Sequence, residues 1–244
     1  MAKIFITGSA DGLGQLAAKA LLQQGHQVVL HARNAERGRK ALKANPEAET
    51  VLIGDLSNMQ DTIQLASQVN ASGPFDVVIH NAGVYQGSAK DIFAVNTLAP
   101  YILTCLVQKP KRLIYLSSGM HLQGRANLDK FHPDNSSISY SDSKLHVLML
   151  CKAVAQKWPD VYANALDPGW VPTKMGGRGA PDNLEKGFAT QVWLSTSNDP
   201  QAKVSGRYFF HQKERPYNLA ADDVHLQERF LDLCQEITGV SFPA

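Results

Sequence analysis

Near its start the chain reads Lys3-Ile4-Phe5-Ile6-Thr7-Gly8-Ser9-Ala10-Asp11-Gly12-Leu13-Gly14. Residues 3–7 form a short apolar run that predicts a strand, and apolar side chains at helical spacing begin at Leu13. A strand, a glycine-rich turn and a helix in succession are typical of a phosphate-binding site, because glycines let a ligand approach the backbone and the helix start offers free N–H groups. The alternative is a tight turn without a ligand. Its place in the first strand–helix unit favours the binding site.

The second predicted strand, residues 28–31, runs into Ala32 and Arg33. An NAD site of this kind carries an acid at the end of its second strand for the ribose hydroxyls. Here Arg33 and Arg37 stand instead, and guanidinium groups suit a 2′-phosphate. Basic side chains are also unfavourable at a helix start, so this pair indicates an anionic partner rather than two solvated arginines. We therefore expect NADP(H) to be preferred over NAD(H).

Strands and helices continue to alternate along the chain. Further strands are predicted over residues 50–54 and 75–80, with a capping box at Ser57-Asn58-Met59-Gln60 opening the helix between them. This alternation predicts an α/β fold, a Rossmann-type doubly wound parallel sheet in a three-layer αβα arrangement. Ligands gather at the carboxyl ends of such strands. The residues found there are Arg33, Asp55, Leu56, Asn81, Ala82 and Gly83.

Tyr140-Ser141-Asp142-Ser143-Lys144 begins an apolar, helix-patterned run to about residue 158. Tyr140 and Lys144 are one turn apart on the same helix face. An ammonium beside a phenol favours the phenolate, so we expect Lys144 to lower the Tyr140 pKa from about 10 toward neutrality. A phenol tuned in this way can exchange a proton with an alcohol or carbonyl oxygen. The pair alone is also compatible with an ordinary exposed helix start.

Two further segments carry polar residues of interest. Residues 91–108 look helical and contain Pro100, which cannot donate to the carbonyl of Asn96, so that carbonyl is expected to be free to accept from water. A strand over residues 111–116 ends in Ser117-Ser118, and one over 161–166 ends in Asp167-Pro168-Gly169.

Composition and charge narrow the function classes. The chain has 244 residues, 44% of them hydrophobic, and its 24 basic and 22 acidic side chains give a net charge of +2. This balance argues against nucleic-acid or membrane-surface binding and favours small-molecule chemistry. The cysteines and histidines lack metal-ligand spacing, so no metal is expected. Neither a leader peptide nor a membrane-spanning run is recognisable, which predicts a cytoplasmic protein.

The last part of the chain predicts a flexible arm and a closing unit. Residues 176–181 are rich in glycine, and a helix is expected over 182–195, so residues 174–190 look like a lid over the sheet edge. A last strand over 207–210 and a helix over 226–237 follow. Because no linker or repeat interrupts the pattern, residues 1–244 are expected to form one domain.

Together these residues resemble the single-domain short-chain dehydrogenase/reductases, in particular the carbonyl-reductase and retinol-dehydrogenase types. The motifs occur in the family's order: Thr7-Gly8-x-x-x-Gly12-x-Gly14, Asp55, Asn81-Ala82-Gly83, Asn96, Ser118, Tyr140-x-x-x-Lys144 and Pro168-Gly169. The resemblance implies about seven parallel strands and a nicotinamide cofactor. The cofactor contacts it implies, with those inferred above, are Gly8, Ser9, Asp11, Gly12, Leu13, Gly14, Arg33, Arg37, Asp55, Leu56, Asn81, Ala82, Gly83, Tyr140, Lys144, Pro168, Gly169, Val171 and Thr173.

The resemblance also implies a mechanism. Ser118, rather than the neighbouring Ser117, donates to a substrate carbonyl oxygen, and Tyr140 protonates that oxygen as hydride arrives from NADPH. Lys144 binds the nicotinamide ribose, and a water between Asn96 and Lys144 belongs to a proton relay. The free Asn96 carbonyl next to Pro100 is our own expectation for that water's acceptor.

Two departures from the family pattern stand out. Ser118 and Tyr140 are 22 positions apart, a longer loop than in the shortest members. Loop residues such as Met120, His121 and Leu122 are expected at the pocket wall; for His121 the alternative is a surface residue without a role in the chemistry. Gly83 and Asn96 are only 13 positions apart, which leaves homodimer, homotetramer and monomer all open.

The leading functional hypothesis is an NADPH-dependent reductase of a small, fairly apolar ketone or aldehyde, or the reverse alcohol oxidation. A catalytically weak NADP-binding sensor or scaffold is the alternative, disfavoured by the intact Ser118, Tyr140 and Lys144. An epimerase of the extended relatives ranks lower, because the chain is short and its glycine spacing differs. The substrate itself is not encoded in any motif of residues 119–139 or 174–190.

Overall fold

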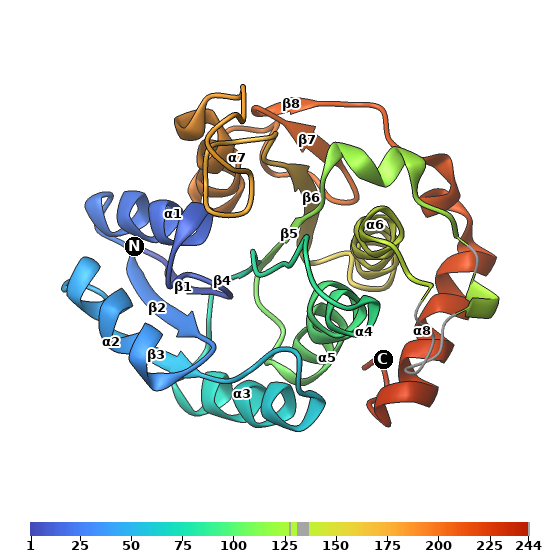
Figure 1. Cartoon of the computed structure of the whole chain (residues 1–244), viewed down its shortest axis with the longest axis horizontal. Helices are drawn as coiled ribbons and strands as arrows, with labels where there is room; N and C mark the ends of the chain where they lie inside the picture. The colour runs from blue at the N-terminus through green and yellow to red at the C-terminus, as the bar shows by residue number, and fades with distance from the viewer. Residues whose placement is uncertain (127, 131–136, 244) are drawn as a thin grey trace.

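The computed structural model describes residues 1–126, 128–130 and 137–243. Its centre is one sheet in the order β3-β2-β1-β4-β5-β6-β7-β8 (Figure 1). The strands are β1 (Lys3–Ile6), β2 (Gln27–Ala32), β3 (Thr50–Ile53), β4 (Val77–His80), β5 (Arg112–Leu116), β6 (Tyr162–Asp167), β7 (Tyr208–Phe210) and β8 (Lys213–Glu214).

Strands β1 to β7 pair in parallel, as expected for a doubly wound sheet. The two-residue β8 was not predicted; it pairs antiparallel with β7 through a tight turn. That turn is His211-Gln212, whose φ angles are 49° and 63°. Such turns usually carry glycine or asparagine, and because His211-Gln212 has neither, no local signal predicts this hairpin.

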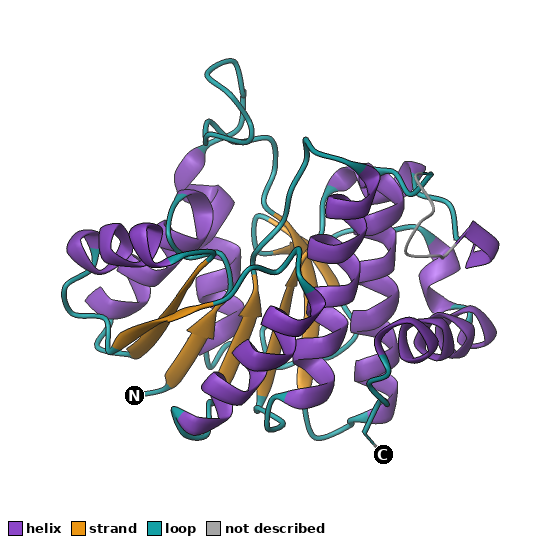
Figure 2. Cartoon of the chain, turned by 60° about the horizontal axis from the view of Figure 1, so that its bottom comes forward, coloured by secondary structure: helices purple, strands orange, loops and turns teal. Residues whose placement is uncertain are grey.

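Helices cover both faces of the sheet (Figures 1 and 2). They are α1 (Gly12–Gln23), α2 (Ala35–Ala44), α3 (Met59–Ala71), α4 (Ala89–Phe93), α5 (Ala99–Leu106), α6 (Tyr140–Lys157), α7 (Leu184–Thr196) and α8 (Val224–Thr238). One buried cluster joins α1, α2 and α7 to the sheet, and a second joins α3, α5, α6 and α8 to its other face. The strands are buried from both sides, which explains their continuous apolar runs.

The direction in which successive strands are added to the sheet changes at β1. The chain moves outward from β1 to β3 and then returns to β4 on the other side of β1. Helices that follow strands on opposite sides of this point diverge, and they leave a crevice at the carboxyl ends of β1 and β4. The glycine-rich turn and residues 81–83 therefore meet there.

The structure refines one helical prediction and corrects another. The segment expected to be helical over residues 91–108 is helical without interruption from Ala89 to Leu106, but it contains a π-helix at Ala94–Leu98 between α4 and α5, with Pro100 in the first turn of α5. The capping box expected at Ser57 is not formed. Asn58 caps α3 by accepting from the Asp61 N–H at 3.1 Å, and Ser57 instead donates to Asp55.

Candidate active site

The glycine-rich turn joins β1 to α1 and uses its glycines for separate reasons. Gly8 and Gly12 have φ of 65° and 57°, left-handed values that favour glycine. A Cβ on Gly8 would also lie 2.9 Å from Ala82 Cα, and one on Gly14 would collide with the Asn81 amide. The turn therefore packs directly on the segment that follows β4.

Hydrogen bonds reinforce this contact between β1 and β4. Asn81 Nδ2 donates to the carbonyls of Thr7 and Gly8 at 2.9 and 3.2 Å. The Ala82 N–H donates to Thr7 Oγ1 at 3.0 Å. The Asn81 side chain thus supports the glycine-rich turn.

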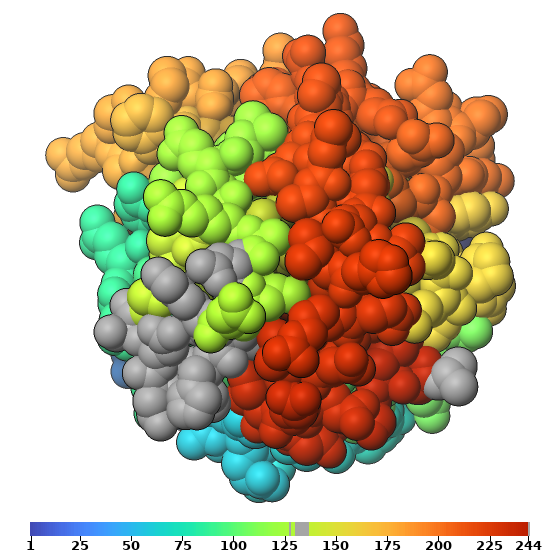
Figure 3. Space-filling model, turned by 90° about the vertical axis from the view of Figure 1, so that its right-hand side faces the viewer, coloured from blue at the N-terminus to red at the C-terminus, as the bar shows by residue number. Residues whose placement is uncertain are grey.

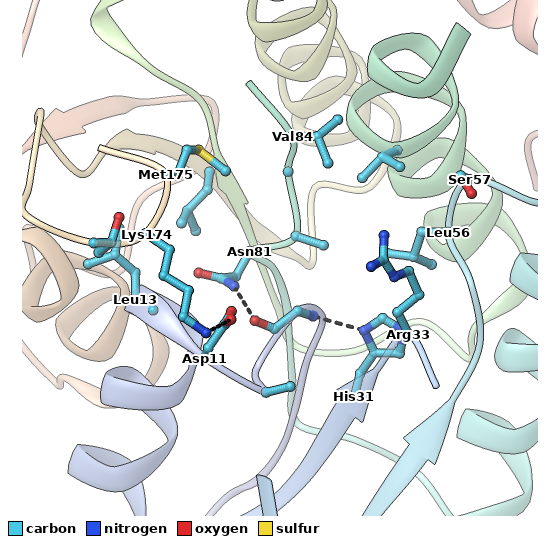
Figure 4. A pocket seen from close by; sticks show the side chains of 18 of the residues that line it. Asp11, Leu13, His31, Arg33, Leu56, Ser57, Asn81, Val84, Lys174 and Met175 are labelled. Carbon is cyan, nitrogen blue, oxygen red and sulfur yellow. Dashed lines mark hydrogen bonds and ion pairs between the residues drawn. The ribbon is translucent and has the colours of Figure 1, made fainter. Parts of the chain in front are cut away.

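His31 joins the turn to the other side of the sheet. Its Nδ1 accepts from the Gly8 N–H at 2.8 Å, and its Nε2 lies 2.9 Å from the carbonyl of Gly54 (Figure 4). Burial lowers the pKa of His31 to about 4, only partly offset by Gly54 and Asp55. The ring is therefore neutral and donates from Nε2. No motif in the sequence predicts this role of His31. The one local indication is a polar residue inside an apolar strand.

A cavity of about 510 Å³ opens over these strand ends. The expected cofactor contacts that line it are Gly8, Asp11, Gly12, Leu13, Arg33, Arg37, Asp55, Leu56, Asn81, Ala82, Gly83, Tyr140, Lys144, Pro168 and Thr173. Residues distant in sequence thus share one space, with the glycine-rich turn and Lys144 lining the same cavity.

Four expected contacts lie outside that lining: Ser9, Gly14, Gly169 and Val171. Ser9 is fully buried, and its hydroxyl donates to the Ile6 carbonyl at 2.9 Å and accepts from the His31 N–H at 2.8 Å. Its side chain is therefore used within the turn and does not face the cavity. Val171 is buried as well, at 4% exposure.

The two arginines expected at the 2′-phosphate differ in their surroundings. Arg37 Nη2 lies 2.8 Å from Asp11 Oδ2, and Lys174 Nζ approaches the same oxygen at 3.3 Å. For Arg33 no carboxylate lies within ion-pair distance in the described part of the chain. Arg33 stands beside Leu56 and Ser57 at the cavity edge (Figure 4). Both arginines were expected to bind a 2′-phosphate. In the structure Arg37 is paired with Asp11, whereas Arg33 has no carboxylate partner among the described residues.

Tyr140 is the first residue of α6, and Lys144 follows it one turn later on the same face. Ser139 caps this helix, and the Asp142 side chain completes a capping box, so the position of Tyr140 is well defined. Lys144 is buried; its Nζ donates to the Leu116 carbonyl at 2.8 Å and lies 5.5 Å from the centre of the Tyr140 ring.

The expected lowering of the Tyr140 pKa is wrong for this structure. Burial raises the pKa of Tyr140 to about 12, the neighbouring Ser118 hydroxyl offsets this in part, and Asp167 and Tyr85 add to it. Burial also lowers the pKa of Lys144 to about 8. Desolvation disfavours charge on either group, and the prediction from their spacing had not included it.

Ser118 and Ser117 point to different partners. The Ser117 hydroxyl donates to the Lys144 carbonyl at 2.8 Å and is buried. The Ser118 hydroxyl lies beside Tyr140 and accepts from the Met120 N–H at 3.3 Å. Of the two serines, the structure thus brings Ser118 to Tyr140 across the long loop.

Asn96 lies in the π-helix, close to Lys144. Its side chain exchanges hydrogen bonds with the backbone of Val84 at 2.8 and 2.9 Å and donates to Ser143 Oγ at 3.0 Å. A Cβ on Gly83 would lie 3.2 Å from Lys144 Nζ and 3.4 Å from Asn96 Oδ1. Gly83 therefore packs closely against both side chains, which a larger residue would crowd.

His121 is not the surface residue that we expected. It is fully buried, with Nδ1 2.6 Å from the Ser118 carbonyl and Nε2 accepting from the Asn218 N–H at 3.2 Å. The C-terminal segment that holds it lies against the segment after β5 in Figure 3 (red against green). Residues 127 and 131–136 of the expected specificity loop lie outside the described residues.

Over the described ranges, no cluster of histidine, cysteine, aspartate and glutamate is arranged to hold a metal ion. Nor do these ranges contain a helix with the length and apolar character needed to cross a membrane.

Known proteins resemble the chain in sequence and in structure. Residues 2–183 match a family model described as short chain dehydrogenase. An uncharacterized oxidoreductase of Emericella nidulans is 45% identical over 100% of this chain and 99% of its own length. The short-chain dehydrogenase chry4 of Gibberella zeae is 40% identical over 100% of both chains. A short chain dehydrogenase from Escherichia coli CFT073 complexed with NADPH has a TM-score of 0.69 at 25% identity, covering 87% of this chain and 97% of that one.

Proposed function

The chain belongs to the short chain dehydrogenase family, oxidoreductases that bind a nicotinamide cofactor, and we propose that it reduces a ketone or aldehyde with NADPH. One observation carries the proposal. Tyr140 and Lys144 line the same cavity as the glycine-rich turn and Arg33, and Ser118 lies beside Tyr140.

The cavity walls suit a dinucleotide, which supplies the hydride when it is bound. Gly8 packs so closely on Ala82 that a Cβ would collide with it. The turn therefore has no side chain at this position, next to the first turn of α1. The N–H groups there suit the pyrophosphate. Arg33, free of a carboxylate partner among the described residues, would bind the 2′-phosphate. The proposed base and nicotinamide contacts are Asp55, Leu56, Pro168 and Thr173.

Tyr140 is proposed as the proton donor. With a pKa of about 12, its hydroxyl carries a proton throughout the neutral range. A protonated phenol can donate to a carbonyl oxygen as negative charge develops on that oxygen. The Ser118 hydroxyl beside it would hold the same oxygen in place.

Lys144 is proposed to act beside Tyr140 rather than on the substrate. An ammonium has three donors, and the Leu116 carbonyl takes one of them. The others would bind ribose hydroxyls and favour the phenolate that forms when Tyr140 gives up its proton. A water between Lys144 and Asn96 would complete the proposed proton relay.

The side chains near Tyr140 favour an apolar substrate. The Tyr85 ring packs edge-on against that of Tyr140, with 4.9 Å between centroids. Met175 lines the cavity from the arm and has exposed apolar surface. Burying such a rim against an apolar ligand is favourable. We propose that residues 174–190 close over it, within a single domain that includes residues 1–244.

The proposal is tested by steady-state rates of the purified protein with ketones, aldehydes and quinones, using NADPH and NADH in parallel. We expect NADPH oxidation that depends on the carbonyl compound and higher kcat/KM with NADPH. A preference for NADH would overturn the cofactor assignment. Tight NADPH binding without turnover on any carbonyl would favour a sensor or scaffold.

A further inference from the structure

Asp167 lies at the end of β6, between two loops of the candidate active site. Its Oδ1 accepts from the Gly169 N–H at 2.8 Å. The Gly119 N–H also donates to this carboxylate, and a Cβ on Gly119 would lie 2.9 Å from Oδ2. One carboxylate therefore contacts the loop that carries Ser118 and the loop that carries Pro168.

Strand register explains why Asp167 reaches both loops. β5 and β6 are parallel neighbours with Leu116 opposite Leu166, so their following residues leave the sheet side by side. The loop after β5 enters a short 3₁₀ helix at Gly119–Gln123, and among the described residues no helix follows β6 before α7. A shared acceptor for two N–H groups is then the direct means of holding them together, since each such bond to a charged group is strong.

The surroundings of Asp167 are buried and contain titratable groups. The Tyr208 ring packs at a tilt against the His121 ring, with 4.6 Å between centroids. The Tyr208 hydroxyl has no hydrogen-bond partner in the part of the chain that the structure describes. Asp167 interacts electrostatically with Tyr208, Tyr140 and Lys144. It is thus a carboxylate of the site that the motifs had not assigned.

We propose that Asp167 is a positioning residue of the active site. Its carboxylate ties the Ser118–Gly119 loop to the Pro168–Gly169 loop, and its charge keeps the proton on Tyr140 until the substrate accepts it. This inference rests on the proposed reductase function. Asp167 would act through the backbone and through its field, without touching the substrate.

The electrostatic part has a defined sign. The groups that face Tyr140 are Ser118, Tyr85, Lys144, Asp167 and Tyr208. Among them the Asp167 carboxylate disfavours the phenolate and Lys144 favours it. Removal of the Asp167 charge should lower the pKa of Tyr140. Asp167 also raises the pKa of Lys144, which burial has lowered to about 8, so removal of its charge should lower that pKa too. The alkaline limb of kcat for carbonyl reduction, which Lys144 reaches first, should therefore move to lower pH.

The first experiment compares Asp167→Asn with Asp182→Asn, a matched change of a second carboxylate near Gly169. Asp182 accepts from the Trp170 N–H at 2.6 Å, and its carboxylate lies next to Gly169 rather than Gly119. We expect Asp167→Asn to lower kcat about 10- to 100-fold, because small misplacement of reacting groups has effects of this size. We also expect it to move the alkaline limb down by about 1 pH unit. Asp182→Asn should change KM more than kcat and leave that limb in place.

A second experiment tests the loop contact by non-additivity. Gly119→Ala should lower kcat in the wild type, since the new methyl group meets Asp167 Oδ2. In an Asp167→Ala background the same methyl group has room, so the two changes together should cost less than the combined single effects. Additive effects, or an unmoved alkaline limb in Asp167→Asn, would overturn the proposal.

Two readouts need no turnover and separate this inference from the proposed function. Amide hydrogen exchange of residues 117–124 and 167–171 should be faster in Asp167→Asn than in Asp182→Asn. In protein labelled with ¹³C at the tyrosine Cζ, the Tyr140 signal, assigned with Tyr140→Phe, should titrate at lower pH in Asp167→Asn. If the wild type reduces no carbonyl compound but both effects appear, the proposed function fails and the inference about Asp167 stands. Equal hydrogen exchange in Asp167→Asn and Asp182→Asn, with an unchanged Tyr140 titration, would refute the inference alone.

Discussion

The His31 ring accepts the Gly8 amide hydrogen at Nδ1, with 2.8 Å between the nitrogens. Through this bond the second strand holds the first glycine of the candidate phosphate turn. The bond requires a neutral ring, since a protonated imidazole has no acceptor nitrogen. Burial favours that neutral form, because it lowers the pKa of His31 to about 4.

His31→Phe should therefore weaken cofactor binding, because it removes the acceptor for the Gly8 N–H from a residue that lines the cavity beside the turn. The Gly8 N–H would lose its acceptor, and the turn would be less well ordered. We expect the Kd for NADPH to rise about tenfold, the size of one lost hydrogen bond. Titration of NADPH fluorescence measures this change. Unchanged affinity in a variant that melts like the wild type would contradict the role given to His31.

His80 provides a test of stability that involves no ligand. Burial lowers its pKa from 6.5 to about 3, and its ring stacks on Tyr115. Between pH 6.5 and 3 the unfolded chain binds a proton at His80 that the folded chain does not, so stability falls as the pH falls through this window.

The variant His80→Phe keeps an aromatic ring for the stack and removes the titration. On acidification from pH 7 to pH 4.5, the free energy of unfolding should fall by about 2–3 kcal/mol less in His80→Phe than in the wild type. Urea unfolding at both pH values measures the difference. Equal acid losses in the two proteins would show that His80 is not responsible.

Arg33 and Arg37 should contribute unequally to NADPH preference. Arg33→Ala removes a cation without a carboxylate partner in the described part of the chain, whereas Arg37 already pairs with Asp11. We expect Arg33→Ala to lower kcat/KM for NADPH about 10- to 100-fold, with little change for NADH. Arg37→Ala is the matched control and should have the smaller effect. Equal losses for both cofactors would contradict a contact with the 2′-phosphate.

Pro100 stands one turn after Asn96, in the first turn of α5. Pro100→Ala adds an N–H that can bond to a preceding carbonyl and draw the π-helix toward α-helical form. We expect lower kcat and an altered pH–rate profile, because the Asn96 carbonyl would be less free for the relay water. Identical profiles in a stably folded variant would argue against this relay.

Local signals made most of the architecture predictable. The apolar strand before Gly8, the left-handed glycines and the capping box at Ser139 depend on near neighbours in sequence. Because parallel strands align their carboxyl ends, the topology then brought Arg33, Asp55 and Asn81 to one edge without further information.

The unpredicted features depend on partners far away in sequence. His31 meets Gly54, His121 meets Asn218, and Asp167 meets Gly119, so none of these contacts leaves a short motif. The Tyr140 pKa was mispredicted for a related reason. Helical spacing revealed the Lys144 neighbour, but burial, which raises that pKa, is a property of the whole fold.

The most direct test of the central claim is NADPH oxidation by wild type and Tyr140→Phe on an apolar ketone or aldehyde at pH 7. We predict turnover by the wild type, and a loss of about 100- to 10,000-fold in kcat for the variant, the usual contribution of a general acid. The Kd for NADPH should change far less than kcat, because Tyr140 is one of many residues that line the cofactor cavity. Equal turnover by the two proteins, or none by the wild type on any carbonyl, would contradict the assignment of Tyr140 as the proton donor of a reductase.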